Sequence, residues 1–406
     1  MSSSTYLRAN VALFAAGFGT FSLLYCVQPL MPIFSEDFGV SPVTSSLSLS
    51  LPTGVLAITI FVTGFMSESW DRKMLISICL LVSSVLTFVA ALSPSWIGLL
   101  AARSLLGIAL GGVPAVAMAY LAEEVRGVGF GFAMGLYVGG TALGGMAGRV
   151  ITGFVAGFWS WRTALYTVAV LGLMTSVAVW VLLPPSDHFV PQRGLGFRVR
   201  AAALSMNIRG AGLSWLFLTA FLLMGSFVTI YNYSTYRLVA PPYNLNQTAI
   251  GAIFLLYLLG MIASALFGRL ADQFGRGPML AISIVLMLSG LLLTTLQSLS
   301  TIIGGMALLT FGFFAGHSVA SGWVGHLAPV AKGQAASLYL LAYYLGASII
   351  GSYGGQFWAH GGWNGVVKLV GLLLVAALII SLRLALLRTP IISRESSVDS
   401  REQRFR

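Results

Sequence analysis

Twelve long apolar segments dominate the 406-residue chain and restrict its fold more than any other feature. A helix needs about 20 mostly apolar residues to cross a bilayer. Lipid offers no partner for backbone polar groups, so such segments are expected to be helical. We predict an all-α membrane protein whose twelve transmembrane helices span about 9–33, 43–66, 74–92, 96–121, 128–156, 162–183, 211–236, 248–268, 279–297, 301–325, 334–358 and 364–387.

Composition excludes a soluble protein. Charged residues make up 8% of the chain and hydrophobic residues 57%, whereas about 25% of a soluble domain is charged. The first apolar run is too long for a signal peptide and is not followed by a cleavage pattern, so we expect it to remain in the protein. Cys26 and Cys79 both lie in apolar runs and are predicted to be free thiols.

The basic residues indicate orientation and give no sign of a nucleic-acid surface. The net charge is +11, but arginines and lysines are scattered at the ends of apolar runs, and most fall on one side of the predicted membrane. Loops rich in Lys and Arg face the cytoplasm. We expect both termini to be cytoplasmic and the protein to be a multi-pass component of a bacterial-type inner membrane.

A short polar sequence occurs twice, 204 residues apart. GRLADQFGRG at 268–277 has a degraded copy, GFMSESWDRK, at 64–73, and the two share the positions Gly64, Glu68, Arg72 and Gly268, Asp272, Arg276. Shifting the chain by about 206 residues also aligns Gly140 with Gly346 and Gly145 with Gly351. The repeat predicts two pseudo-symmetric six-helix bundles, at 1–183 and 211–388, with a cytoplasmic linker at 184–210 and a cytoplasmic tail at 389–406.

The repeated sequence resembles motif A of the Major Facilitator Superfamily, which implies a secondary transporter whose substrate binds where the halves meet. By this resemblance, Glu68 would face the helix start near Gly333, and Asp272 the helix start near Gly127. Arg72 would bind Glu123 or Glu124. These contacts would hold the cytoplasmic side shut and break when it opens. The first copy departs from the motif at Glu68, Ser69 and Asp71; the alternative is a set of ordinary charged turn residues.

Two further patterns resemble motifs of the same superfamily. Arg103, Gly107 and Gly111 resemble motif B, whose arginine is associated with proton coupling; the alternative is a structural arginine tied to neighbouring carbonyls. Segment 128–156 resembles motif C of the drug:proton antiporter branch, although Gly145 replaces its proline and Arg149 its last glycine. We expect packing glycines here to lie across the seam between the halves; the packing glycines are Gly140, Gly144, Gly148, Gly346 and Gly351.

The predicted cavity holds cations and few other titratable groups. Arg149 is expected at the depth of Arg103, while all eleven acidic residues lie outside the interiors of the spans. This favours neutral or anionic substrates. His317 is the only histidine well inside a span and either titrates near neutral pH or is a hydrogen-bonded core residue. Candidate substrate contacts, which could instead be outer-interface residues, are Tyr25, Gln28, Tyr231, Asn232 and Tyr233.

These observations predict a secondary active transporter of small organic molecules that works by alternating access. Proton-coupled efflux of a drug or metabolite is the leading interpretation, and import or facilitated movement of a small organic anion is the alternative. A phosphate-binding Gly-Lys loop is absent from the sequence, which argues against an ATP-driven pump. We expect a monomer in the lipid bilayer that uses protons and a small-molecule substrate, with no enzymatic activity, cofactor or metal.

Overall fold

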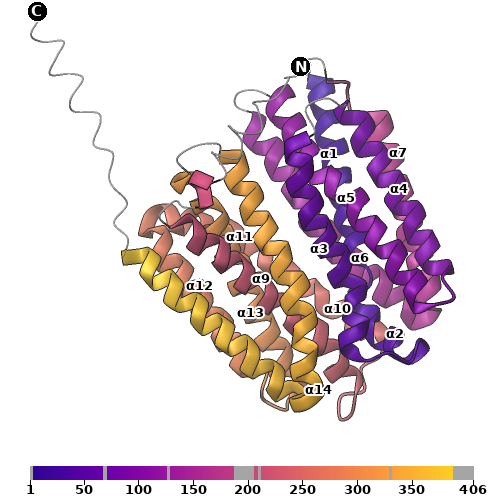
Figure 1. The fold of residues 1–406 in the computed structure, drawn as a ribbon, viewed down its shortest axis with the longest axis vertical. Coiled ribbons are helices and arrows are strands. Elements are labelled where there is room, and N and C mark those ends of the chain that lie inside the picture. The colour runs from indigo at the N-terminus through magenta and orange to yellow at the C-terminus, as the bar shows by residue number, and fades with distance from the viewer. Residues whose placement is uncertain are drawn as a thin grey trace, which may run out of the picture.

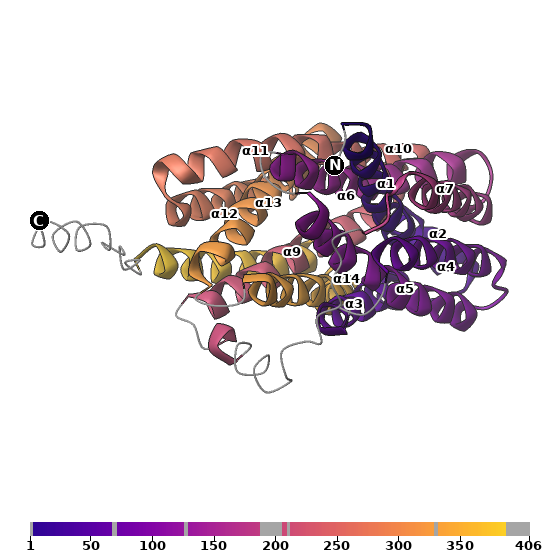
Figure 2. The same ribbon diagram turned by 90° about the horizontal axis from the view of Figure 1, so that it is seen from above.

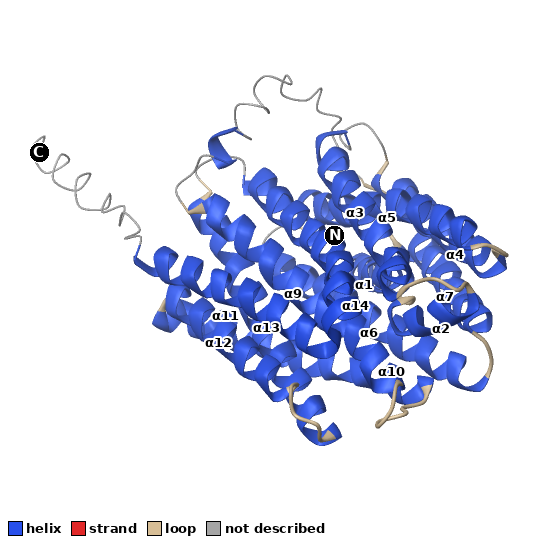
Figure 3. Cartoon of the chain, turned by 60° about the horizontal axis from the view of Figure 1, so that its bottom comes forward, coloured by secondary structure: helices blue, strands red, loops and turns tan. Residues whose placement is uncertain are grey.

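The computed structural model describes residues 3–66, 71–125, 129–186, 205–208, 212–328 and 332–386. Within these ranges the regular structure is helical, without a strand (Figure 3). The first half contains α1 (Ser3–Tyr25), η1 (Gln28–Leu30), α2 (Met31–Asp37), α3 (Pro42–Met66), α4 (Arg72–Leu92), α5 (Trp96–Glu124), α6 (Phe130–Phe158) and α7 (Trp161–Leu182). The second half contains α9 (Leu213–Val239), α10 (Gln247–Ile253), η4 (Phe254–Leu256), α11 (Tyr257–Phe274), α12 (Arg276–Leu293), α13 (Leu299–Leu327) and α14 (Lys332–Leu386).

The predicted all-α fold is confirmed, and the spans match the expected segments. Among the described residues, 11 helices are long and apolar enough to cross a membrane. The last of these, α14, has 55 residues and reverses direction at Gly362, whose φ of 55° and ψ of −145° are not helical. Glycine adopts this conformation without a steric penalty. The two limbs of α14 are therefore separate membrane crossings, so the described residues contain twelve crossings.

Two spans that the sequence predicts as continuous helices are interrupted. The first is broken after Tyr25, where η1 and α2 begin with Pro29 and Pro32 near their first positions. Proline lacks an N–H and fits the first turn of a helix but not its interior. The eighth span is interrupted by η4, which contains no proline. Both interruptions place polar backbone inside the protein, where neighbouring helices can satisfy it.

The helices form two bundles that lie side by side (Figure 2). We call the end at which α1 begins and α14 finishes the terminal end, and the opposite end, which includes the reversal at Gly362, the far end. Figure 1 shows the bundles leaning together at the far end.

Glycines bring pairs of helices into backbone contact within each half. A Cβ atom on Gly148 would lie 2.6 Å from the carbonyl oxygen of Ser22, and Gly140 and Gly144 similarly face Phe14 and Phe18 of α1. In the second half, Gly346 faces the carbonyl of Phe221 on α9, and Gly351 packs against Val228. The prediction that this face crosses the seam is wrong, because each series contacts a helix of its own half.

We predict that Gly144→Ala destabilises the protein. The added methyl would lie 2.6 Å from the Cα atom of Phe18, and overpacking of this kind costs about 1–3 kcal/mol of unfolding free energy. Gly139→Ala is the matched control, since a Cβ there meets nothing within 4 Å. Thermal unfolding of the detergent-purified variants measures the difference; equal melting temperatures for the two would contradict the packing role.

Candidate functional site

Hydrogen bonds between uncharged groups join the two halves toward the far end. They include Gln28 to Asn232 at 2.7 Å, Ser46 to Ser352 at 3.3 Å and Ser348 to the carbonyl of Ser50 at 2.7 Å. Further bonds of the same kind link Ser35 with Tyr236, Tyr236 with Met31 and Gln247 with Pro29. Each neutral hydrogen bond contributes only about 0.5–1.5 kcal/mol of net stability. Breaking any one of them therefore costs little free energy.

The halves also meet through glycine. The Cα of Gly153 on α6 lies 2.8 Å from the position that a Cβ on Gly251 of α10 would occupy. Farther along α6, Gly157 contacts Thr248. Small residues at a helix crossing let the two backbones touch without interlocking side chains. This α6–α10 crossing is a glycine contact that does lie across the seam, and Gly355 of α14 makes another against Val43 of the first half.

Arg149 lies at the centre of the seam and is 2% exposed. Its Nε donates to the side-chain oxygen of Gln28 at 2.6 Å, and its Nη1 donates to the carbonyl of Gly145 at 2.6 Å. Its guanidinium carbon is 4.0 Å from the ring centroid of Tyr25 and 4.9 Å from that of Tyr257. A cation on an aromatic face is stabilised by the ring quadrupole.

A chain of hydrogen bonds leads from Arg149 across the seam. Gln28 accepts from Arg149 and donates through its amide nitrogen to the Asn232 side-chain oxygen. The Asn232 amide in turn donates to the carbonyl of Gly351 at 3.4 Å. Gln28 and Asn232 are both completely buried. The structure thus brings together three of the predicted cavity residues, Arg149, Gln28 and Asn232, and connects α6 and η1 to α9 and α14.

The tyrosines that flank Asn232 form hydrogen bonds to groups of their own half. The Tyr231 hydroxyl is 2.7 Å from the Thr310 hydroxyl, and the Tyr233 hydroxyl donates to the carbonyl of Gly351 at 3.0 Å. Tyr25 behaves differently, because its ring covers the Arg149 guanidinium. Of the three predicted tyrosine contacts, Tyr25 is the one placed against the seam cation.

Arg103 is bound by backbone carbonyls. Its Nε donates to Ser48 at 3.1 Å, its Nη1 to Leu23 at 2.7 Å, and its Nη2 to Leu24. An arginine in hydrocarbon costs about 2.5–3.5 kcal/mol on insertion scales, and three carbonyl acceptors offset that cost. The side chain ties α5 to α1 and α3, as the structural alternative predicts.

His317 on α13 forms a hydrogen bond of 3.0 Å between its Nδ1 and the Tyr339 hydroxyl. Its ring centroid lies 4.6 Å from that of Tyr343, and Phe313 stacks on it at 6.1 Å. The imidazole is partly buried among these aromatic rings. A hydrogen-bonded histidine beside a tyrosine can accept a proton or serve only as a packed core residue.

At the terminal end, the structure brings Arg72 and Glu123 together. Arg72 Nη2 is 2.8 Å from Glu123 Oε1, and its Nε is 3.3 Å from Oε2. Glu124 is buried beside this pair at the end of α5. Asp71, which departs from motif A, caps α4 by accepting from the Met74 amide at 2.6 Å. Glu68 lies outside the described residues, and Gly64 lies in the last turn of α3.

The second copy of the sequence is arranged differently. Arg276 Nη2 is 3.1 Å from Asp272 Oδ1 and 2.8 Å from His326 Nε2. His326 therefore takes the place that Glu123 occupies in the first half. The Asp272 side chain is 72% exposed, and its partner belongs to its own half. Gly127, near which Asp272 was expected, lies outside the described residues.

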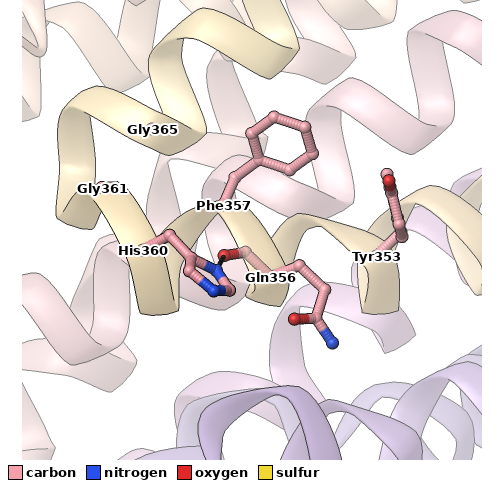
Figure 4. A pocket seen from close by; sticks show the side chains of 6 residues that line it. All are labelled: Tyr353, Gln356, Phe357, His360, Gly361 and Gly365. Carbon is pink, nitrogen blue, oxygen red and sulfur yellow. Dashed lines mark hydrogen bonds between the residues drawn. The ribbon is translucent and has the colours of Figure 1, made fainter.

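Figure 4 shows a pocket of about 330 Å³ at the reversal of α14, lined by Tyr353, Gln356, Phe357, His360, Gly361 and Gly365. His360 Nδ1 donates to the carbonyl of Gln356 at 2.8 Å. The three polar side chains are exposed. Because the lining comes from one stretch of one helix, this pocket is separate from the seam, and the predicted site residues do not line it.

The chain matches a family model described as "Major Facilitator Superfamily" over residues 13–239 and 216–406. The chain belongs to the Major Facilitator Superfamily. It is 45% identical over 383 residues to "Inner membrane transport protein YnfM" of Escherichia coli strain K12, covering 93% of this chain and 91% of that protein. It is 44% identical over 376 residues to "Uncharacterized MFS-type transporter YybF" of Bacillus subtilis strain 168, covering 93% of each.

Solved structures share the fold of this superfamily member. A bacterial homologue of the human lysosomal transporter Spinster, in an inward-facing and unoccupied conformation, superposes with a TM-score of 0.79. The comparison covers 95% of this chain and 98% of that one at 16% sequence identity. The protein is therefore a multi-pass membrane transporter of the Major Facilitator Superfamily fold.

Several seam residues of this transporter were not predicted from the sequence. Phe254 and Tyr257 lie over Arg149 at 5.2 and 4.9 Å, but they look like ordinary apolar and interfacial residues in the sequence. The serines of α3 and α14 could have been identified from the sequence. The run SSLSLS at 45–50 and the pair Ser348 and Ser352 are hydroxyls spaced along otherwise apolar spans, which is typical of interhelical hydrogen bonding.

We predict that Asp272→Asn slows transport about two- to fivefold. By the resemblance to motif A, the Asp272 carboxylate would lie at a helix start of the other half in the closed state, where it would contribute about 0.3–1 kcal/mol, and losing it would shift the conformational equilibrium by that factor. The thermal stability should not change, because an exposed ion pair contributes little. Initial rates in proteoliposomes measure the effect, and Arg269→Gln, an exposed charge on the same helix, is the control. Equal rates for both variants and the parent would rule out a switching role.

Proposed function

We propose that this transporter moves small organic molecules out of the cell in exchange for protons, by alternating access at the seam between its halves. The observation that carries the alternating access is the far-end seam itself. It is held by neutral hydrogen bonds and a glycine crossing, whereas each half is held internally by glycine-to-backbone packing and by the buried Arg103. Separation at the seam costs less than deformation of a half.

The proposed direction and coupling rest on residue patterns. The glycine series of α6 resembles the motif that marks the drug:proton antiporter branch, and efflux follows from that resemblance. Proton coupling needs a titratable group, and the pair formed by His317 and Tyr339 supplies one within the spans. We place the terminal end, with both termini, in the cytoplasm of an inner membrane and propose that the transporter acts as a monomer. In that orientation the far-end contacts close the outer side.

The second candidate is import or facilitated movement of a small organic anion. It is favoured by Arg149, a buried cation at the seam whose hydrogen-bond acceptors are neutral. Proteoliposomes loaded with a pH-sensitive dye distinguish the two candidates when a panel of neutral, anionic and cationic compounds is applied. Proton movement opposite to the substrate supports the first candidate, and substrate flux without proton movement supports a facilitator.

We predict that His317→Gln reduces the pH dependence of flux by at least about half. An imidazole can take up and release a proton and a glutamine side chain cannot, while glutamine retains hydrogen bonding to Tyr339. Substrate binding should remain measurable in the variant. Tyr339→Phe is the control, because it leaves the imidazole in place. Full pH dependence in His317→Gln would remove the histidine from the mechanism and favour a facilitator or a proton carried by the substrate.

A further inference from the structure

Arg149 is a buried cation with an incomplete set of acceptors. Two of its three nitrogens, Nε and Nη1, donate to Gln28 and Gly145. In the described part of the chain, Nη2 has no acceptor and no carboxylate lies within 4.0 Å of the guanidinium. Arg103 provides the contrast, since each of its three nitrogens donates to a carbonyl. A structural role accounts for Arg103 but leaves Arg149 unexplained.

An unsatisfied buried hydroxyl lies beside Arg149. The Tyr257 hydroxyl is buried and has no hydrogen-bond partner, and the ring of the same residue is 4.9 Å from the guanidinium carbon. Buried hydroxyls in native proteins are nearly always hydrogen-bonded. An acceptor carrying negative charge satisfies both groups at once, because guanidinium and phenol are both donors. A carboxylate matches the planar fork of arginine.

The surroundings indicate what the carboxylate is attached to. Tyr25, Phe254 and Tyr257 surround the guanidinium. Toward the terminal end, α1 continues the aromatic face of Tyr25 with the partly exposed Phe14, Phe18 and Phe21, at spacings of three and four residues. An apolar or aromatic body fits such a face. Because the Arg149 guanidinium is the cation among these rings, a ligand with a single negative charge would match it.

We propose that Arg149, assisted by the Tyr257 hydroxyl, binds the carboxylate of a small aromatic monocarboxylic acid, and that this binding loosens the far-end seam. The proposal rests on the transport function proposed above and specifies its substrate class. The acid approaches from the terminal end along α1, and its carboxylate takes the Nε and Nη2 edge of Arg149.

The coupling to the seam follows from the position of Gln28. Its oxygen accepts from Arg149 Nε, and its nitrogen donates to Asn232 of the other half. A carboxylate that takes Nε competes with the Gln28 oxygen. Displaced from Arg149, the Gln28 amide is no longer held in place for Asn232, and the bond across the seam is weakened. Ligand binding and seam opening are thereby linked through one side chain.

The test is equilibrium binding of radiolabelled benzoate to purified protein in nanodiscs, with benzamide and benzylamine as neutral and cationic competitors. We expect saturable benzoate binding that neither competitor displaces. Arg149→Gln should weaken binding at least about tenfold, and Arg149→Lys less, because lysine retains the charge but not the fork. Gln28→Ala should bind at least as tightly as the parent, since the competing acceptor is gone.

A matched tyrosine pair tests the hydroxyl. Tyr257→Phe should weaken benzoate binding about threefold, whereas Tyr231→Phe should not, because the Tyr231 hydroxyl is already bonded to Thr310. Thermal unfolding of each variant shows that it is folded. No benzoate binding to the parent, or equal binding to folded Arg149→Gln, overturns the proposal. If benzoate does not bind but the protein transports another compound, the proposed transport function stands and only the binding proposal fails. If benzoate binds but the protein transports no compound, the transport function is contradicted and the binding proposal stands.

Discussion

The two halves of this transporter are joined by uncharged hydrogen bonds that lie toward one end. Gln28 with Asn232, and Ser46 with Ser352, are donor–acceptor pairs whose members can exchange partners with water or with a ligand at small net cost. The crossing of Gly153 and Gly251 adds contact without interlocking side chains. A buried ion pair across the same surface would be much harder to separate, because each half would be left with an uncompensated charge.

The interior of each half is built in the opposite way. Gly140, Gly144 and Gly148 bring α6 against the backbone of α1. Arg103 ties α5 to α1 and α3 through three carbonyls. In the proposed mechanism, tightly packed halves joined by a seam of neutral hydrogen bonds would favour a rocking motion of one half against the other, as alternating access around a central site requires.

The sequence predicted the fold well because apolar length and an internal repeat depend on local composition. The twelve segments and the helix reversal near residue 362 follow from apolar length and spacing, and the pairing of Arg72 with an acid at the end of α5 follows from the resemblance to motif A. The seam was predicted only in part. Gln28, Asn232 and Arg149 stand out as polar residues in apolar spans, but Tyr257 does not, and neither does the interruption of the eighth span, which contains no proline.

The placement of the glycine series could not be derived from one sequence. Glycine at every fourth position predicts a close helix crossing, but it does not say which helix is crossed. Here Gly144 contacts α1 within its own half, and the seam is crossed instead by Gly153. In the same way, a buried arginine in the sequence predicts hydrogen-bond acceptors around its guanidinium, but it does not say whether backbone carbonyls or a ligand provide them. Arg103 and Arg149 have the same chemistry and different acceptors.

The central claim is that the far-end seam must separate during transport, and a reversible cross-link tests it most directly. The Ser46 and Ser352 hydroxyl oxygens are 3.3 Å apart, which is close enough for a disulfide after Ser46→Cys and Ser352→Cys. Substrate flux should be lost when the double variant is oxidised and return on reduction, while each single variant stays active throughout. Parental flux through the oxidised, fully cross-linked protein would contradict the account.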